Sequence, residues 1–297
     1  MTRRSRPAGW HGLVVVDKPA GITSHDVVAR CRRIFGQRQV GHAGTLDPDA
    51  TGVLLVGLGS VTRLLRFCSV LPKSYVGEVV LGTETTTLDA GGAVVATHDM
   101  AGVTPDDART AAAGLVGEIE QVPPMVSAVK VGGRRLHELA REGLEVERSA
   151  RPVVVLRFDV DEGPEPGVLS IAVDCSSGTY VRTLAADLGT ALGGGAHLRA
   201  LRRTAVGHFR VAGARPLDAV GPDAVLPPLE AVGHLPRVTV DAPTAAAVAH
   251  GSVLPGAATG FVGDGPWAVV GGEGALLAVY EGRPDGSAKP TVVLASN

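Results

Sequence analysis

The chain of 297 residues has few groups that could cross-link it or hold a metal. Its three cysteines, Cys31, Cys68 and Cys175, are odd in number and form no CxxC pair. This pattern excludes a disulfide scaffold and is typical of a reducing compartment. The nine histidines show neither HxxxH spacing nor a His/Cys cluster, so the sequence predicts no metal site.

Long apolar runs are also missing. No run reaches the roughly 18 residues that a membrane span needs, and no apolar segment followed by a cleavage site resembles a signal peptide. We therefore expect a cytoplasmic protein without membrane contact. The chain is 45% hydrophobic and 20% charged, which favours one large folded domain with or without a small extra one. Flexibility is expected only in residues 1–10.

The sequence lacks the common motifs of nucleotide-binding proteins and of serine hydrolases. Gly57 and Gly59 could begin a GxGxxG loop, but Thr62 takes the place of the last glycine. The sequence contains neither GxxxxGK[ST] nor GxSxG. We therefore reject a dinucleotide site, a P-loop and a GxSxG hydrolase.

The formal net charge of −2 argues against a uniformly basic nucleic-acid binder, but the charge is unevenly distributed. Residues 1–66 contain ten Lys or Arg and four Asp or Glu. A second basic cluster lies within residues 197–210, which contain no acidic residue. Segregated charge can make a basic face on a neutral protein and so bind a polyanion, although solvated surface arginines would give the same pattern.

Strand-like and helix-like segments follow one another without regular βαβ alternation, which predicts an α+β fold with a largely antiparallel sheet. Residues 121–151 mix prolines, glycines and basic residues, and we interpret them as an inserted arm. The segment from residue 237 onward predicts a small β-rich domain after a proline-rich linker. Strands are predicted at 12–17, 53–59, 73–82, 91–97, 152–160, 169–175 and 196–211, and helices at 24–36, 104–117 and 183–193.

The loop GHAGTLDPDATG (41–52) contains more than a connector needs. Pro48 biases Asp47 toward extended backbone, and Gly44 and Gly52 permit turns and close approach. Such a loop can present one carboxylate rigidly to a ligand, although an ordinary Asp-Pro turn has the same residues. His42 is a candidate acid–base group or stacking ring, or else a histidine bonded to the loop backbone.

Tyr180 and Arg182 are two residues apart in a segment that reads as extended, so we expect both side chains on one side of a strand. An arginine beside an aromatic ring can pair with a carboxylate and stack on a base. A structural salt bridge is the alternative role.

Several segments together resemble the TruB family of tRNA pseudouridine synthases. They are LVVVDKPAGITSHDVV, HAGTLDPDATGVLLVGLG, KSYVGEVVLG, QVPPMVSAVKVGGRRLHELAREGLEVER, CSSGTYVRTLAADLG and GAHLRALRRTAVG. The resemblance covers roughly residues 12–210 in order and spacing, and is weak beyond about residue 237. Val126 and His137 stand where the family often has tyrosine, which bears on RNA contacts of the arm.

The resemblance implies a pseudouridine synthase fold, with a large mainly antiparallel or mixed central sheet and flanking helices. It assigns residues 11–230 to the catalytic domain and 237–297 to a PUA-like domain. The implied reaction isomerises the uridine at position 55 in the T loop of tRNA, by base flipping and without cofactor or metal. We expect a monomer with no obligatory protein partner.

The resemblance also assigns roles to residues. Asp47 would be the essential carboxylate, acting either as a nucleophile on the ribose or as the base that starts glycal formation. Arg182 would pair with Asp47, Tyr75 would stack on the flipped base, and His42 would help fill the space that the base leaves. The remaining substrate contacts would be Tyr180, the Leu201 backbone, Lys18, Lys130, Arg202 and Arg203.

Three other functions stay open at this point. A non-catalytic RNA-binding or RNA-folding protein could keep the fold, although the intact Asp47, Tyr75 and Arg182 argue against loss of activity. A synthase could act on another uridine, as the guide-dependent branch of the family does, but the long basic extensions of that branch are absent here. An unrelated hydrolase using Asp47 lacks a partner motif.

Overall fold

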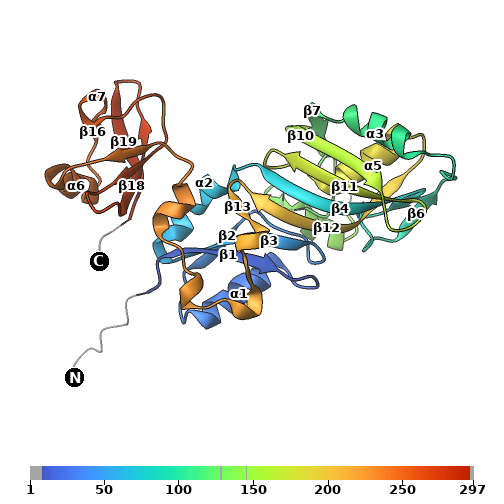
Figure 1. The fold of residues 1–297 in the computed structure, drawn as a ribbon, viewed down its shortest axis with the longest axis horizontal. Helices are drawn as coiled ribbons and strands as arrows, with labels where there is room; N and C mark the ends of the chain where they lie inside the picture. The colour runs from blue at the N-terminus through green and yellow to red at the C-terminus, as the bar shows by residue number, and fades with distance from the viewer. Residues whose placement is uncertain (1–8, 128, 145, 295–297) are drawn as a thin grey trace.

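A ten-stranded mixed sheet runs through the middle of the computed structural model, which describes residues 9–127, 129–144 and 146–294 (Figure 1). The expected flexible N-terminus, residues 1–10, falls largely outside these residues. Only the pairs β1–β14 and β3–β12 are parallel within the sheet, which confirms the predicted α+β class. In spatial order the strands are β14 (Arg215–Pro216), β1 (Gly12–Lys18), β3 (Thr51–Leu58), β12 (Ala196–Val206), β4 (Lys73–Leu81), β11 (Val168–Cys175), β10 (Arg151–Glu162) and β7 (Gly117–Gln121), with β2 (Val40–Ala43) beside β3 and β13 (Phe209–Arg210) beside β12.

The β1–β3 part of the sheet is buried on both faces, which is why GLVVVD is apolar without alternation. Helix α1 (Ser24–Ile34) covers one face with Val27, Val28 and Cys31. It begins with a Thr23/Asp26 capping box, close to the predicted start. The other face is covered by η1 (Gly59–Arg63), α2 (Leu65–Ser69) and η5 (Pro228–Val232). Three short 3-10 helices lie in the chain between β13 and η5: η2 (Val211–Gly213), η3 (Leu217–Ala219) and η4 (Pro222–Ala224).

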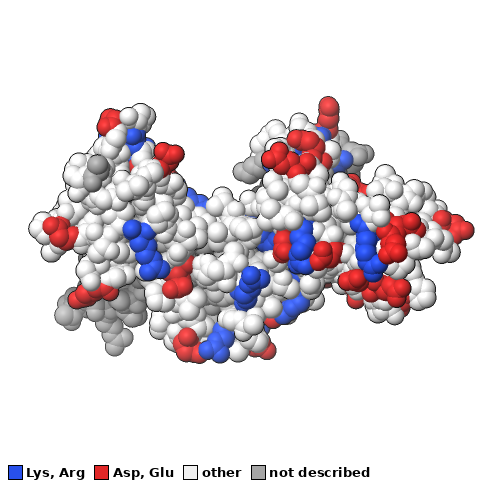
Figure 2. Space-filling model, turned by 45° about the horizontal axis from the view of Figure 1, so that its top comes forward, with Lys and Arg blue, Asp and Glu red and all other residues white. Residues whose placement is uncertain are grey.

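The other part of the sheet is covered on one face only. Helices α3 (Pro105–Ala113) and α5 (Val181–Ala191) pack over β4, β10, β11 and β12. On the opposite face arginines pair with acids across strands, as in Arg157–Asp174 and Arg199–Glu78. On the face that Figure 2 presents, basic and acidic side chains lie next to one another.

Two excursions leave the sheet. The hairpin of β5 (Thr83–Thr85) and β6 (Val94–Thr97) follows β4. Between β7 and β10, which are neighbours with Gln121 opposite Arg151, the chain forms β8 (Lys130–Val131), β9 (Arg134–Arg135) and α4 (Leu136–Arg141). The second excursion corresponds to the inserted arm of the sequence analysis, and an RNA-binding role for it stays a prediction.

Residues from Arg237 onward form a separate five-stranded sheet, shown in orange to red in Figure 1. One of its faces has a core of its own around Trp267 and Tyr280. The other face, with Val270 and Val279, joins the apolar cluster around Val232 of η5. Its elements are β15 (Arg237–Thr239), α6 (Ala242–Ala249), β16 (Leu254–Pro255), α7 (Gly256–Thr259), β17 (Trp267–Val270), β18 (Leu276–Gly282) and β19 (Ser287–Val293). Among the described residues, no helix has the length and apolar character to cross a membrane.

Gly52 allows β3 and β12 to approach each other beside the loop 41–52. Its φ is +103°, and a Cβ atom there would lie 2.1 Å from the carbonyl oxygen of Arg203. We expect Gly52→Ala to lower the free energy of unfolding by about 3 kcal/mol or more, measured by denaturant titration, because strain and a backbone clash add. Gly193→Ala is the control, since Gly193 has a φ of +82° with nothing within 4 Å of its Cβ position. It should cost only about 1 kcal/mol, and equal losses would contradict the close-approach argument.

Candidate active site

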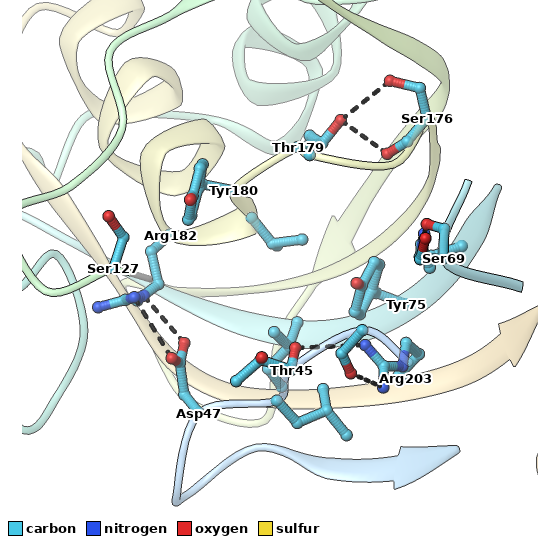
Figure 3. Close-up of a pocket in the computed structure, with 16 residues that line it drawn as sticks. Thr45, Asp47, Ser69, Tyr75, Ser127, Ser176, Thr179, Tyr180, Arg182 and Arg203 are labelled. Carbon is cyan, nitrogen blue, oxygen red and sulfur yellow. Dashed lines mark hydrogen bonds and ion pairs between the residues drawn. The ribbon is translucent and has the colours of Figure 1, made fainter. Parts of the chain in front are cut away.

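A pocket of about 270 Å³ opens where β4, β12 and the start of α5 face the loop 41–52 (Figure 3). Its size is near the lower end for small-ligand sites, which suits a single base. Of the residues expected from the sequence to form the site, it brings together Asp47, Tyr75, Tyr180, Arg182, Leu201 and Arg203.

Asp47 and Arg182 form an ion pair at one end of the pocket. The Nε of Arg182 lies 3.1 Å from Oδ2 of Asp47. The Arg182 side chain is 5% exposed, whereas that of Asp47 is 42% exposed. The carboxylate is therefore fixed from behind by a buried guanidinium and remains open toward a ligand.

The same guanidinium connects three more acceptors from distant parts of the chain. Its Nη1 donates to the carboxylate of Asp89 and to the carbonyl of Thr87, at 3.1 and 3.0 Å. Its Nη2 donates to the carbonyl of Val126 at 2.8 Å. Asp89 is held in turn by the Thr87 hydroxyl and the Gly91 amide. Arg182 thus joins the loop, the β5–β6 hairpin and the first residues after β7.

The loop backbone around Asp47 is fixed on its N-terminal side. Arg203 donates to the carbonyls of Gly44 and Val53 at 2.8 and 2.7 Å. The hydroxyl of Ser24, at the start of α1, accepts from the Leu46 amide at 2.9 Å and donates to the Leu46 carbonyl at 3.1 Å. The peptide groups before Asp47 therefore have little freedom.

The residue after Asp47 is fixed as well. Lys18 is fully buried, and its ammonium donates to the carbonyls of Pro19, Ile22 and Pro48 at 2.7 to 2.8 Å. The Gly21 amide adds a second bond to the Pro48 carbonyl. Burial lowers the pKa of Lys18 to about 8, and the charges of Asp49 and Asp47 oppose that shift.

Burial also governs the ionisation of the pocket residues. It raises the pKa of the Asp47 carboxyl, Arg182 opposes this shift, and Asp89 adds to it. Burial raises the pKa of the Tyr75 hydroxyl, again opposed by an arginine, Arg203. Lys18 also lowers the pKa of Asp47, after Arg182. Tyr75 therefore presents a neutral ring to the pocket, next to a carboxyl group whose negative charge two cations stabilise.

The expectation that Tyr180 and Arg182 lie in a strand is wrong. Tyr180 is the N-cap residue of α5, and Arg182 lies in the first turn of this helix. The segment offers no capping side chain at Tyr180, so the sequence contains no helix-start signal there. Both residues nevertheless line the pocket.

Lys18 and Arg203, which the resemblance gives as substrate contacts, are both buried, so a contact of either with substrate stays a prediction. Lys18 is 0% and Arg203 is 1% exposed, and both bind loop carbonyls. Arg202 precedes Arg203 and lies on the opposite face of β12, where it pairs with Asp17 at 2.6 Å. The side chain of Lys130 lies outside the described residues, so its role stays a prediction.

His42 does not line the pocket and instead packs edge-to-face against His25, with ring centroids 5.2 Å apart. Burial, followed by the neighbouring His25, lowers the pKa of His42 to about 4. Its buried Nδ1 has no hydrogen-bond partner within the part of the chain that the structure describes. The ring is therefore neutral near pH 7.

Sequence reasoning missed several residues that shape the site. Asp89 lies in the TTTLDA segment, where no spacing relates it to an arginine 93 residues away. Lys73 lines the pocket and donates to the carbonyls of Ser69 and Leu71, and burial lowers its pKa to about 8. Lys73 is two residues before Tyr75 on a strand, so both side chains lie on the same face, and this spacing was the signal available in the sequence.

Comparison with known proteins gives consistent matches. A family model described as TruB family pseudouridylate synthase (N terminal domain) matches residues 32–181, and a tRNA pseudouridylate synthase B C-terminal domain model matches residues 182–222. Both matches end before the five-stranded sheet.

Two proteins named tRNA pseudouridine synthase B are similar over almost their whole length. That of Mycobacterium sp. (strain KMS) is 49% identical over 95% of this chain and 96% of its own. That of Mycobacterium tuberculosis (strain ATCC 25618 / H37Rv) is 46% identical over 95% of both. A chain solved in a Cbf5-Nop10-Gar1 complex matches with a TM-score of 0.71 and 28% identity, over 97% of this chain and 84% of that chain.

We expect Arg182→Gln to raise the pKa of the Asp47 carboxyl further, because it removes the cation that opposes the effect of burial most strongly, ahead of Lys18. The carboxyl carbon shift in a ¹³C NMR titration of both proteins measures this change. Arg202→Gln is the control, since its guanidinium pairs with Asp17. An Asp47 pKa that is unchanged in Arg182→Gln would show that the ion pair does not govern its ionisation.

Proposed function

Because this chain belongs to the TruB family of pseudouridylate synthases, we propose that it is a tRNA pseudouridine synthase that isomerises uridine-55 of the T loop. The observation that carries this proposal is the Asp47–Arg182 pair at one end of a base-sized pocket beside Tyr75. An open carboxylate on a rigid loop is the group that an attack on the ribose requires.

The reaction breaks the N1–C1′ bond of uridine and forms a C5–C1′ bond to the same ribose. The C5 proton is lost and N1 gains a proton, so atoms balance without a redox partner. Asp47 must be ionised, whether it attacks C1′ as a nucleophile or removes a ribose proton to start glycal formation. Arg182 stabilises this charge and orients the carboxylate. Its Nε lies 3.1 Å from Oδ2 of Asp47, and its Nη2 lies 3.4 Å from Oδ1.

The other pocket residues fit the base. Tyr75 offers its ring face for stacking, and Tyr180 and Val181 line the pocket from α5. Leu201 lines the pocket as well, and its backbone groups can pair with the polar edge of uracil. Flipping a base out of a folded loop costs a few kcal/mol, and a neutral, half-buried His42 can fill the space that the base leaves.

The proposal also covers the substrate, the cellular location and the oligomeric state. The mycobacterial relatives are named as tRNA enzymes, which supports the T arm of tRNA as the partner. The sequence is closer to them than to the chain solved with Nop10 and Gar1, at 49% and 46% against 28% identity. We therefore propose a cytoplasmic monomer without an obligatory protein partner, in which the arm and a PUA-like C-terminal domain contact RNA.

We expect Asp47→Asn to abolish pseudouridine formation while tRNA binding stays within about tenfold, or roughly 1.4 kcal/mol. The purified protein is incubated with unmodified tRNA, and pseudouridine is mapped by position. Asp49→Asn is the matched control, because Asp49 is exposed in the same loop, and it should retain turnover. Modification in the Asp47 variant would reject the catalytic assignment, and modification away from position 55 would reject the proposed substrate site.

Replacements of Tyr75 separate its ring from its hydroxyl. Tyr75→Phe keeps the ring face and should lower the single-turnover rate less than Tyr75→Leu, because stacking on a base is worth about 1–3 kcal/mol. Quenched reactions with enzyme in excess over tRNA measure both rates. Equal and negligible losses would rule out the stacking role.

A further inference from the structure

Three pocket residues, Tyr180, Val181 and Arg182, lie at the start of helix α5, yet this helix start has no side-chain cap. Tyr180 is the N-cap residue, and its side chain accepts no hydrogen bond from the first turn. Helix starts without such a cap are usually fixed by other contacts. Here the position of the first turn decides where Tyr180 and Arg182 lie.

The missing fixation comes from Gln121, which is 59 residues earlier in the chain. The side-chain amide of Gln121 accepts from the Tyr180 amide at 2.9 Å and donates to the Tyr180 carbonyl at 3.3 Å. Because a backbone N–H can only donate and a carbonyl can only accept, the two bonds fix the amide orientation. The side chain is 2% exposed, so water does not compete for these bonds.

Gln121 is anchored independently of the pocket. It is the last residue of β7 and lies opposite Arg151 on β10. It does not line the pocket, whereas Tyr180, Val181 and Arg182 all do. Five residues later, the carbonyl of Val126 accepts from Arg182. The edge of the sheet and the pocket wall are thus joined at one amide.

From these contacts we infer that Gln121 is a positioning residue for the isomerisation: it fixes the start of α5 and so aims Arg182 at Asp47. The inference rests on the proposed function. It assigns Gln121 an effect on turnover at saturating RNA, and only a small effect on RNA binding, because the amide does not reach the pocket.

The chain contains a matched control for the same chemistry. The amide of Gln37 accepts from the Trp10 amide at 2.7 Å and donates to the Trp10 carbonyl at 3.0 Å. This pair is exposed and lies outside the pocket. Gln37 also donates to the carbonyl of Gln39 at 3.2 Å. Gln37→Leu therefore removes two bonds equivalent to those of Gln121, and one more, without touching the pocket wall.

Single-turnover rates and RNA affinity are measured for the wild type, Gln121→Leu and Gln37→Leu, with thermal unfolding of each. We expect Gln121→Leu to lower the rate by about tenfold or more and to change Kd by no more than about threefold. Gln37→Leu should stay within about twofold of the wild type in both. A Gln121→Leu rate equal to that of Gln37→Leu, or a loss confined to Kd, would overturn the inference.

Gln121→Glu adds a readout that a loss of stability alone does not produce. A protonated carboxyl can accept from the Tyr180 amide and donate to its carbonyl, whereas a carboxylate can only accept. Burial raises carboxyl pKa values, so the rate of this variant relative to the wild type should fall as pH rises from about 5 to 8. A relative rate that does not change with pH would contradict the positioning role. This test does not depend on whether Gln121→Leu folds. A wild type that forms no pseudouridine in the same assay would instead reject the proposed function, and the inference with it.

Discussion

The ion pair between Asp47 and Arg182 is the interaction around which the site is organised. A single buried guanidinium donates to four residues: Asp47 in the loop, Thr87 and Asp89 in the β5–β6 hairpin, and Val126 after β7. An arginine can do this because its donors are arranged in a rigid planar fork. A lysine at this position would offer one point charge and could not fix the same four acceptors in the same plane.

A second constraint is that the loop is held by buried cations. Lys18 and Arg203 are almost completely buried, and each is satisfied by backbone carbonyls. Taking such charges out of water is costly unless their hydrogen bonds are complete. Each nitrogen of the two charged groups has a carbonyl partner, and the bonds to Gly44, Thr45 and Pro48 lie within three residues of Asp47. Removing either side chain would leave unpaired carbonyls in the interior and loosen the one carboxylate that has to stay fixed.

Hydropathy predicted much of this fold, because strands such as GLVVVD and LSIAVDC have patterns that burial dictates. The sequence could not reveal that Arg202 and Arg203 differ, since neighbours in a basic cluster look alike until a strand places them on opposite faces. It also misjudged the start of α5, where the cap comes from a glutamine distant in sequence. The site residues Asp47, Tyr75 and Arg182 came from family resemblance. Their supports Asp89, Ser24 and Gln121 came only from tertiary contacts, which no local pattern encodes.

The arm leaves and rejoins the sheet between strands that are already neighbours, with Gln121 opposite Arg151. The hydrogen bonds between β7 and β10 therefore hold the two ends of the arm together, and the arm itself is not needed for this. Loop-closure entropy changes only slowly with loop length, so insertions and deletions beyond the first few residues of the arm would cost the catalytic domain little stability. The pocket is thus fixed by long-range bonds, whereas the length of the arm beyond its first few residues is fixed neither by the β7–β10 pairing nor by the pocket.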